Sequence, residues 1–171
     1  MRHVALFYSV VLTKSRRIRS ADLFAVAKAA DLTPIKTVLS TGNLVFDAVD
    51  PEPALEARLE GATRLVLGKT IPNFVRSSQT FRAMLDANPF AAVPAGQVAA
   101  RILRDKPSRD TMARLAACLA AAERPAETDR VLWVATPTPQ SPVLRAAALP
   151  WVGPGTFRAA TALHKIAASL A

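Results

Sequence analysis

The stretch from Ile35 to Asp47 constrains the fold of this chain more than any other. It reads IKTVLSTGNLVFD, two short β-branched runs on either side of a Thr41-Gly42-Asn43 turn. Such runs joined by a tight turn are typical of a β-hairpin. Gly42 and Asn43 are residue types that adopt a positive φ at low cost, so we expect the chain to reverse there.

The segments around this hairpin alternate between buried-strand and amphipathic-helix patterns. A continuous apolar run comes first, and two later segments carry leucine and alanine at helical spacing. We expect a strand at His3–Val11, a helix from Ser20 to about Ala30 with Ser20 as its cap, a helix from Glu52 to Gly68, and a strand at Ile71–Arg76. This βαββαβ order predicts a ferredoxin-like unit, a four-stranded antiparallel sheet with both helices on one face.

The rest of the chain repeats this order imperfectly. Ser78 is expected to cap a short helix, and the break in pattern at Val93-Pro-Ala-Gly96 divides the chain into subdomains at 1–92 and 93–171. Beyond the break we expect a strand at Val98–Leu103, a helix at Ser108–Ala122, a strand at Val131–Thr136, a short helix at Val143–Ala148, and a final helix from Thr156 to about Leu170. The predicted fold class is therefore α+β with two ferredoxin-like subdomains, the second having helices where another strand would stand.

Composition places the chain among globular proteins. Hydrophobic residues make up 51% and charged residues 20%, values typical of a folded domain. No apolar run approaches the roughly 20 residues that span a bilayer, and the apolar N-terminal run lacks the cleavage site of a signal peptide. Cys118 is the only cysteine, which excludes an intramolecular disulfide and favours a cytoplasmic protein with no membrane association.

The charge balance favours an acidic partner. Lys and Arg total 22 against 13 Asp and Glu, which leaves a net charge of +9 and a pI near 10.8. Nucleic acids, phosphorylated metabolites and anionic surfaces all suit such a chain, whereas a solvated arginine-rich surface accounts for the same charge without a partner. Aromatic residues are only 6%, which disfavours extended stacking platforms for single strands.

A cluster of basic residues follows the first strand. Lys14, Arg16, Arg17 and Arg19 lie in the loop that leads to the first helix, a place where functional sites often lie. The loop contains no glycine, so it does not resemble a phosphate-binding loop, in which glycines let the backbone approach the phosphate. Electrostatic contact with nucleic acid remains open.

A second candidate lies on the expected final helix. Arg158, Thr161 and Lys165 share the polar side of that helix, opposite an apolar face. The Gly-Pro-Gly approach at 153–155, exposed backbone N–H groups and two cations suit a phosphate or a carboxylate. An ordinary solvated basic helix face is the alternative interpretation.

No catalytic set can be assembled from the residues. His3 and His164 do not combine with Cys118 into a metal cluster, so we expect neither a metal nor a cofactor, and no nucleophile motif such as GxSxG is present. His3 is expected at a strand end, and Cys118 as a packed core thiol beside the apolar stripe of its helix. The carboxylates are placed for capping and ion pairs. Whether the chain is an enzyme remains open.

Several segments together resemble a known family. ALF at 5–7, RI at 17–18, ADL at 21–23, STGNLVF at 40–46, ANPF at 87–90 and GTFRAATALHKIA at 155–167 resemble the DUF1697 family of mostly bacterial domains of unknown function. That family typically carries ALLRGINVGG, then QSGNVVF, ANPF and a closing TARNWNTVTKLA. The resemblance implies two ferredoxin-like α+β subdomains, in agreement with the strand order above.

The chain departs from the family pattern at polar positions. Residues 8–14 read YSVVLTK where the family has RGINVGG, so the arginine, the asparagine and the glycines are replaced. Gly42 and Asn43 remain in the hairpin turn, and Arg158 and Lys165 remain in the closing segment. The resemblance implies that these four residues are what this divergent member retains of the shared polar positions.

Three functional hypotheses follow. The first is a non-enzymatic binding or scaffold protein that contacts nucleic acid, because RNA-recognition domains use a comparable four-stranded sheet. The second is a small-anion site, for phosphate or carboxylate, formed by Gly42, Asn43, Arg158 and Lys165, which requires the hairpin turn and the start of the last helix to meet at a pocket. The third is a structural protein that binds only a protein partner. The oligomeric state is not predicted.

Overall fold

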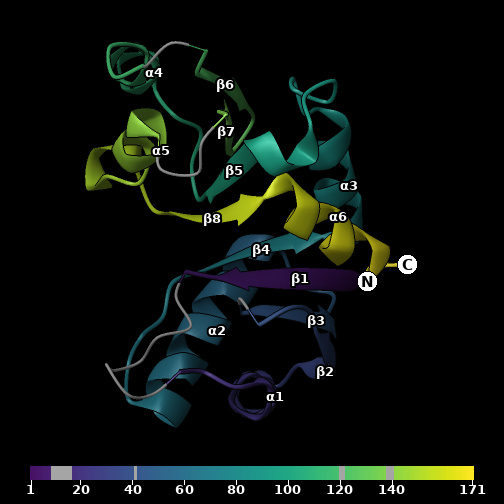
Figure 1. The fold of residues 1–171 in the computed structure, drawn as a ribbon. Helices are drawn as coiled ribbons and strands as arrows, with labels where there is room; N and C mark the ends of the chain where they lie inside the picture. The colour runs from purple at the N-terminus through teal and green to yellow at the C-terminus, as the bar shows by residue number, and fades with distance from the viewer. Residues whose placement is uncertain (9–16, 41, 120–121, 138–140) are drawn as a thin grey trace. The chain divides into compact units, whose positions relative to one another are not determined.

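The chain forms two compact α+β units, each built on one four-stranded antiparallel sheet. The first unit contains Met1–Arg82 together with Lys165–Ala171, and the second contains Ala83–His164. Within the described part of the chain, no helix is both long and apolar enough to span a bilayer. The computed structural model (Figure 1) describes residues 1–8, 17–40, 42–119, 122–137 and 141–171.

The first unit has the predicted βαββαβ order. Its strands are arranged β2-β3-β1-β4, and β1 pairs antiparallel with both β3 and β4. The two helices pack together on one face of the sheet (Figure 1), which confirms the ferredoxin-like arrangement. The elements are β1 (Arg2–Phe7), α1 (Ser20–Ala29), β2 (Thr33–Thr37), β3 (Asn43–Asp47), α2 (Glu52–Leu67), β4 (Asn73–Ser77) and α3 (Ser78–Asp86).

The hairpin lies where its sequence predicted. β2 and β3 pair antiparallel, with Thr37 opposite Leu44, and Gly42 has the positive φ of 74° expected of it. Asn43 is the first residue of β3 rather than a turn residue, and Leu39 supplies a second positive φ, of 59°. Residue 41 lies outside the described residues, as do the last residues of the strand predicted to reach Val11.

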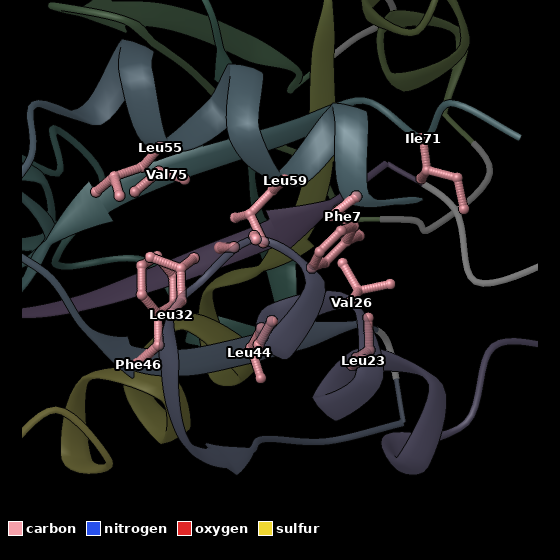
Figure 2. Close-up of a cluster of buried hydrophobic side chains, with 14 of the residues drawn as sticks. Phe7, Leu23, Val26, Leu32, Leu44, Phe46, Leu55, Leu59, Ile71 and Val75 are labelled. Atoms are coloured by element: carbon pink, nitrogen blue, oxygen red, sulfur yellow. The ribbon is translucent and has the colours of Figure 1, made fainter. Parts of the chain in front are cut away.

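The first core fills the space between one face of the sheet and the two helices (Figure 2). Phe7 and Phe46 from the sheet meet Leu55 and Leu59 of α2 and Val26 of α1, all fully buried. Alternation along β1 and leucines at i, i+4 on α2 bring these side chains to a common layer. At roughly 1.5–3 kcal/mol for each large apolar side chain, this burial is the main stabilising term of the unit.

Two predicted helix caps are each displaced by one residue. Arg19, not Ser20, is the N-cap of α1, and its backbone N–H donates to Asp22 Oδ2 at 2.8 Å. The Ser20 hydroxyl instead lies 2.8 Å from Thr37 Oγ1 on β2. At α3 the cap is Ser77, whose Oγ accepts from the backbone N–H of Thr80 at 3.0 Å. The Ser77 hydroxyl reaches the backbone N–H three residues on, which explains the shift at α3.

The second unit repeats the strand order of the first as β6-β7-β5-β8. Its central strand β5 pairs antiparallel with β7 and with β8. The copy is therefore complete in its strands, and the expectation of helices in place of a strand is wrong. The elements of this half of the chain are η1 (Ala95–Gln97), β5 (Val98–Leu103), α4 (Arg109–Ala116), β6 (Arg124–Thr128), β7 (Val131–Ala135), α5 (Pro142–Ala147), η2 (Pro150–Val152), β8 (Gly155–Ala159) and α6 (Ala160–Ala168), and the part of α6 from Lys165 onward belongs to the first unit.

The start of the final helix was predicted wrongly. Residues 155–159 form β8, and α6 begins only at Ala160. The alanine-rich sequence that follows is a strong helix former. When this segment is considered without the rest of the chain, its helical pattern therefore includes residues 155–159. Pairing with β5, which sets Arg158 opposite Ala100, decides the conformation instead.

The helix predicted at Ser108–Ala122 is shorter than expected. Ser108 caps it, accepting from the backbone N–H of Thr111 at 3.1 Å, but α4 ends at Ala116. Cys118 consequently lies beyond the helix and is exposed, with its thiol 3.3 Å from the carbonyl oxygen of Arg114. The prediction of a packed core thiol is therefore wrong, because the helix ends before Cys118 and the adjacent Leu119 is itself exposed.

Candidate functional site

Gly42 and Asn43, the two hairpin residues of the predicted anion site, make hydrogen bonds that stabilise the hairpin. The backbone N–H of Phe7 donates to the carbonyl oxygen of Gly42 at 2.9 Å. The side chain of Asn43 is fully buried, and its Nδ2 donates to the carbonyl oxygen of Val38 at 2.8 Å. Solvent does not reach the Asn43 amide, so these contacts tie the turn to β1 and close the hairpin.

Arg158 lies on β8, not on a helix, and its side chain is buried with 7% exposure. Its Nη1 donates to Thr156 Oγ1 at 2.9 Å and to the carbonyl oxygen of Phe157 at 2.7 Å. Burial lowers the pKa of the Arg158 guanidinium to about 10, which leaves the group charged at neutral pH. The predicted alignment of Arg158 with Thr161 and Lys165 on one helix face is wrong, since only the last two belong to α6.

The four residues of the predicted anion site fall in different parts of the structure. Gly42 and Asn43 are neighbours in the first unit, and Arg158 belongs to the second. Lys165 is exposed on α6, in the C-terminal segment that belongs to the first unit.

The basic segment before α1 forms a defined surface. Lys14 and Arg16 lie outside the described residues, whereas Arg17 and Arg19 are exposed on either side of Ile18. Ile18 is 7% exposed and belongs to the first core. This buried anchor fixes the segment so that its two arginines face solvent.

An exposed lysine lies on β2, the strand that the start of α1 contacts. The hydrogen bond between Ser20 and Thr37 sets the start of α1 beside β2, and the neighbouring Lys36 is exposed. Arg17, Arg19 and Lys36 are called the cationic patch below. Sequence reasoning missed Lys36 because the contact between α1 and β2 is a feature of the tertiary structure; its only local signal was a lysine on an edge strand.

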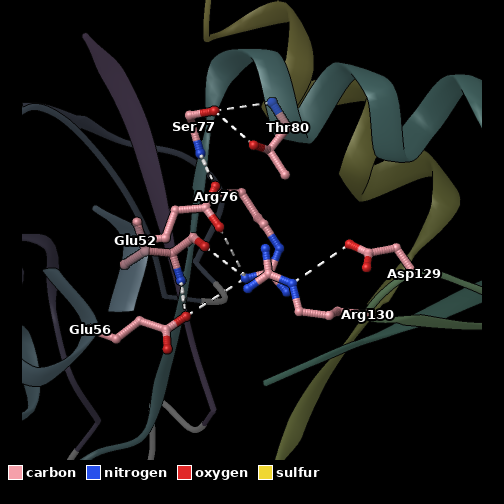
Figure 3. Close-up of polar contacts among 8 residues, drawn as sticks. Glu52, Glu56, Arg76, Ser77, Thr80, Asp129 and Arg130 are labelled. Atoms are coloured by element: carbon pink, nitrogen blue, oxygen red, sulfur yellow. Dashed lines mark hydrogen bonds and ion pairs between the residues drawn. The ribbon is translucent and has the colours of Figure 1, made fainter. Parts of the chain in front are cut away.

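A buried ionic cluster seals the outer edge of β4 (Figure 3). The backbone N–H of Val75 donates to Glu56 Oε1, and that of Ser77 donates to Glu52 Oε1, both at 2.9 Å. Arg76, 1% exposed, places Nη1 3.6 Å from Glu56 Oε1 and 4.0 Å from Glu52 Oε2. β4 is an edge strand, so no further strand of this sheet can accept hydrogen bonds from these N–H groups. The two glutamates accept them instead.

Arg76 and Arg158 occupy equivalent positions in the two sheets. Each is the fourth residue of the last strand, and each donates Nη1 to the carbonyl oxygen of the residue before it, Val75 or Phe157, at 2.7 Å. The segment between β7 and β8 has no glutamate, whereas α2 supplies two in the first unit. Sequence reasoning assigned the carboxylates to capping and ion pairs in general and missed Arg76, because burial of a charged side chain has no local sequence signal.

A groove of about 590 Å³ lies between α1 and α2 and is lined by Ala29, Ala30, Asp31, Arg58, Gly61, Ala62 and Leu65. Arg58 donates Nε to the carbonyl oxygen of Ala30 at 3.1 Å and Nη2 to that of Asp31 at 2.9 Å, and it pairs with Asp50 at 2.6 Å. The guanidinium therefore caps the C-terminus of α1. Arg58 and Asp31 are the titratable residues of the lining, and they form no acid–base couple.

Groups that suit a metal are missing from the part of the chain that the structure describes. There, no three His, Cys, Asp or Glu side chains lie close enough to hold an ion. His3 is 1% exposed, stacks on Phe46 with ring centroids 5.7 Å apart, and places Nδ1 3.0 Å from the carbonyl oxygen of Met1. Its place at the strand end agrees with the sequence, and its neutral Nδ1–H can donate to that carbonyl.

His3 makes folding stability depend on pH. Burial is the main cause that lowers the pKa of His3 below 6.5, and the N-terminal ammonium acts in the same direction, whereas the Met1 carbonyl, Glu52 and Asp47 raise it. The unfolded chain therefore binds a proton at a pH where the folded chain does not, and the contribution of His3 to stability is lost as the pH falls below 6.5. We expect urea denaturation between pH 5 and 8 to show a smaller pH dependence for His3→Gln than for the wild type. Parallel curves for the two proteins would contradict this assignment.

Comparison with known proteins places the chain in a family. No curated protein matches it. A structure described as that of a conserved bacterial protein from Streptococcus pneumoniae matches with a TM-score of 0.79 over 99% of this chain and 98% of that one, at 16% identity, which shows a shared fold. The family model described as protein of unknown function (DUF1697) matches residues 1–133, a range that includes the hairpin and both α1 and α2 but ends before the closing segment. The chain therefore belongs to the DUF1697 family.

Proposed function

We propose that this protein is a non-enzymatic nucleic-acid-binding protein that contacts phosphates through the cationic patch of Arg17, Arg19 and Lys36. The observation that carries the proposal is the exposure of Arg17 and Arg19 on either side of the buried Ile18, together with the exposed Lys36 on β2, next in sequence to the Thr37 that contacts Ser20. Arginine and lysine side chains displace counterions from a phosphate backbone, which supplies most of sequence-independent affinity. Asp22 pairs with Arg19 at 3.9 Å, a distance and an exposure at which an ion pair contributes little.

The net charge of +9 supports a polyanion as the partner. Part of the positive charge is not available for binding, because Arg76 and Arg158 are buried. The exposed cations are therefore the groups that remain for an external anion. Since they contact phosphates rather than bases, binding is expected to depend strongly on salt and weakly on sequence.

The manner of binding differs from that of RNA-recognition domains. Those domains stack bases on exposed aromatic residues of the sheet. Here the sheet of the first unit carries Phe7, Phe46 and Phe74, and all three are fully buried. The small-anion hypothesis ranks second, because the side chains of Asn43 and Arg158 are buried and hydrogen-bonded within their own units.

The test is salt-titrated fluorescence anisotropy with labelled single-stranded and duplex oligonucleotides. We expect the wild type to bind both at low salt. Replacing Arg17, Arg19 and Lys36 by alanine is expected to weaken binding about tenfold or more, and to lower the slope of log K against log salt by about 2, since each lost phosphate contact removes about 0.7–0.9.

A matched triple variant controls for net charge. Lys28, Arg82 and Arg124 are also exposed, are also one lysine and two arginines, and lie on α1, α3 and β6. Replacing these three residues by alanine is expected to change the affinity for oligonucleotides, and the slope of log K against log salt, much less. Equal losses in the two triple variants would show that only net charge matters, and no salt-sensitive binding by the wild type would refute the proposed function.

A further inference from the structure

The second unit holds an arginine flat against a tryptophan. The Cζ atom of Arg114, in the last turn of α4, lies over the Trp151 ring at 4.1 Å from its centroid. Trp151 is half-buried on η2 and packs against the second hydrophobic core, whereas Arg114 is exposed. The ring is therefore fixed from below by the core and covered from above by the guanidinium.

This arrangement orients the guanidinium before any ligand arrives. A cation over a tryptophan face is attracted electrostatically by the ring, so the side chain loses part of its rotamer freedom on folding. A planar group held in place binds with a smaller entropic cost than a mobile one. The outer face of the guanidinium and its N–H groups at the edge then face solvent, where they suit a planar π-system and an anion.

The elements that pack against α4 carry more basic than acidic side chains, and the Glu127 carboxylate of β6 pairs with Lys106 at 3.4 Å. α4 and α5 pack against each other (Figure 1), and exposed Arg109 and Arg145 lie on these two helices. Residues 131–171 contain no aspartate or glutamate at all, so α5, η2 and β8 bring no acidic side chain to this surface. Asp110, in the first turn of α4, is the acidic side chain on that helix. An anion that carries flat rings matches both the charge and the exposed guanidinium plane.

We propose that the Arg114–Trp151 pair binds single-stranded nucleic acid by stacking one base on the outer face of the Arg114 guanidinium. This inference rests on the proposed function and adds the class of nucleic acid. Arginine planes and aromatic rings stack unpaired bases, whereas the bases of a duplex are already stacked on one another and present only their edges. Stacking on Arg114 therefore favours a single strand over a duplex. The phosphate contacts of the cationic patch do not distinguish the two.

The experiment measures anisotropy of labelled oligo-dT and of a duplex, together with intrinsic tryptophan fluorescence. Trp133 is fully buried and its indole N–H donates to Thr128 Oγ1 at 2.7 Å, so Trp151 is the tryptophan that a ligand can reach. We expect oligo-dT to change the fluorescence of the wild type but not that of Trp151→Phe. Arg114→Ala is expected to weaken binding of oligo-dT about tenfold, within the range measured for loss of one stacked base, and to change duplex binding less than twofold.

Arg114→Lys separates stacking from charge. It keeps the positive charge but removes the plane, so it is expected to lose nearly as much affinity for oligo-dT as Arg114→Ala, while Arg82→Ala, an exposed arginine on α3, loses little. Full rescue by lysine, or an unchanged Trp151 signal with binding intact, overturns this inference and leaves the proposed function standing. Absence of binding to any nucleic acid overturns both.

Discussion

Replacing Arg76 by methionine is expected to lower the free energy of unfolding by about 3–5 kcal/mol, the loss typical of removing one partner from a buried ionic cluster. Arg76 is 1% exposed and lies between Glu52 and Glu56 at 4.0 and 3.6 Å (Figure 3). Without the guanidinium, Glu56, itself 5% exposed, keeps its negative charge in a buried place. Methionine fills much of the same volume, so lost charge compensation, not a cavity, dominates the result.

The measurement is urea denaturation followed by far-ultraviolet circular dichroism, which reports on both units. The matched control is Lys106→Met, because Lys106 pairs with Glu127 at 3.4 Å but has 61% of its side chain exposed, and such pairs contribute about 0–1 kcal/mol. The double variant R76M/E56Q is expected to recover part of the loss, since glutamine keeps an acceptor for Val75 and carries no charge. Similar losses in R76M and Lys106→Met would contradict the role given to the cluster.

Replacing Gly155 by alanine is expected to destabilise the second unit by about 1–3 kcal/mol, the usual cost of inserting a methyl group into a packed core. A Cβ at this position would lie 2.6 Å from Leu103 Cδ2 and 2.8 Å from both Arg101 Nε and the carbonyl oxygen of Ile102. Neither the Leu103 side chain nor the Arg101 side chain can move away from such a methyl group easily. The Arg101 guanidinium donates Nη1 to Ala147 and Nη2 to Gly153, both at carbonyl oxygens, and Leu103 belongs to the second core.

Both tryptophans lie in the second unit, so tryptophan fluorescence during urea denaturation follows this variant directly. Gly96→Ala is the matched control, because a Cβ there would meet no atom within 4 Å and its φ is not positive. That change is expected to be neutral or to stabilise the protein by up to about 1 kcal/mol through the unfolded state. If Gly155→Ala were as stable as Gly96→Ala, the close approach of β8 to β5 would not constrain this position.

Neither residue is part of the proposed binding surfaces. The residues of the cationic patch and Arg114 are exposed and Trp151 is half-buried, whereas Arg76 and Gly155 are buried on the last strand of each sheet. Loss of stability in these variants is therefore separable from loss of nucleic-acid binding. The binding experiments can be run on alanine variants of exposed residues, which usually change stability by less than 0.5 kcal/mol.

The amino-acid sequence was sufficient for most of the first unit. Strand alternation, leucines at helical spacing in α2, and the glycines at 42 and 68, with φ of 74° and 72°, are local signals, and each corresponds to a preference of the backbone or to one buried face. The exposed arginines at 17 and 19 were also predicted as a basic surface, since a charged loop residue is seldom buried.

The rest depended on contacts between distant segments. β8 was read as helix because its neighbours favour helix, and only pairing with β5 makes it a strand, which in turn moves Arg158 from a helix face to the interior. Burial of Arg76 between two glutamates of α2, the contact of Ser20 with Thr37 on β2, and the position of Arg114 over Trp151 likewise join residues that are far apart in sequence. Propensity and periodicity act within one segment, whereas these features arise from packing energy between segments, which is defined only once the chain has folded.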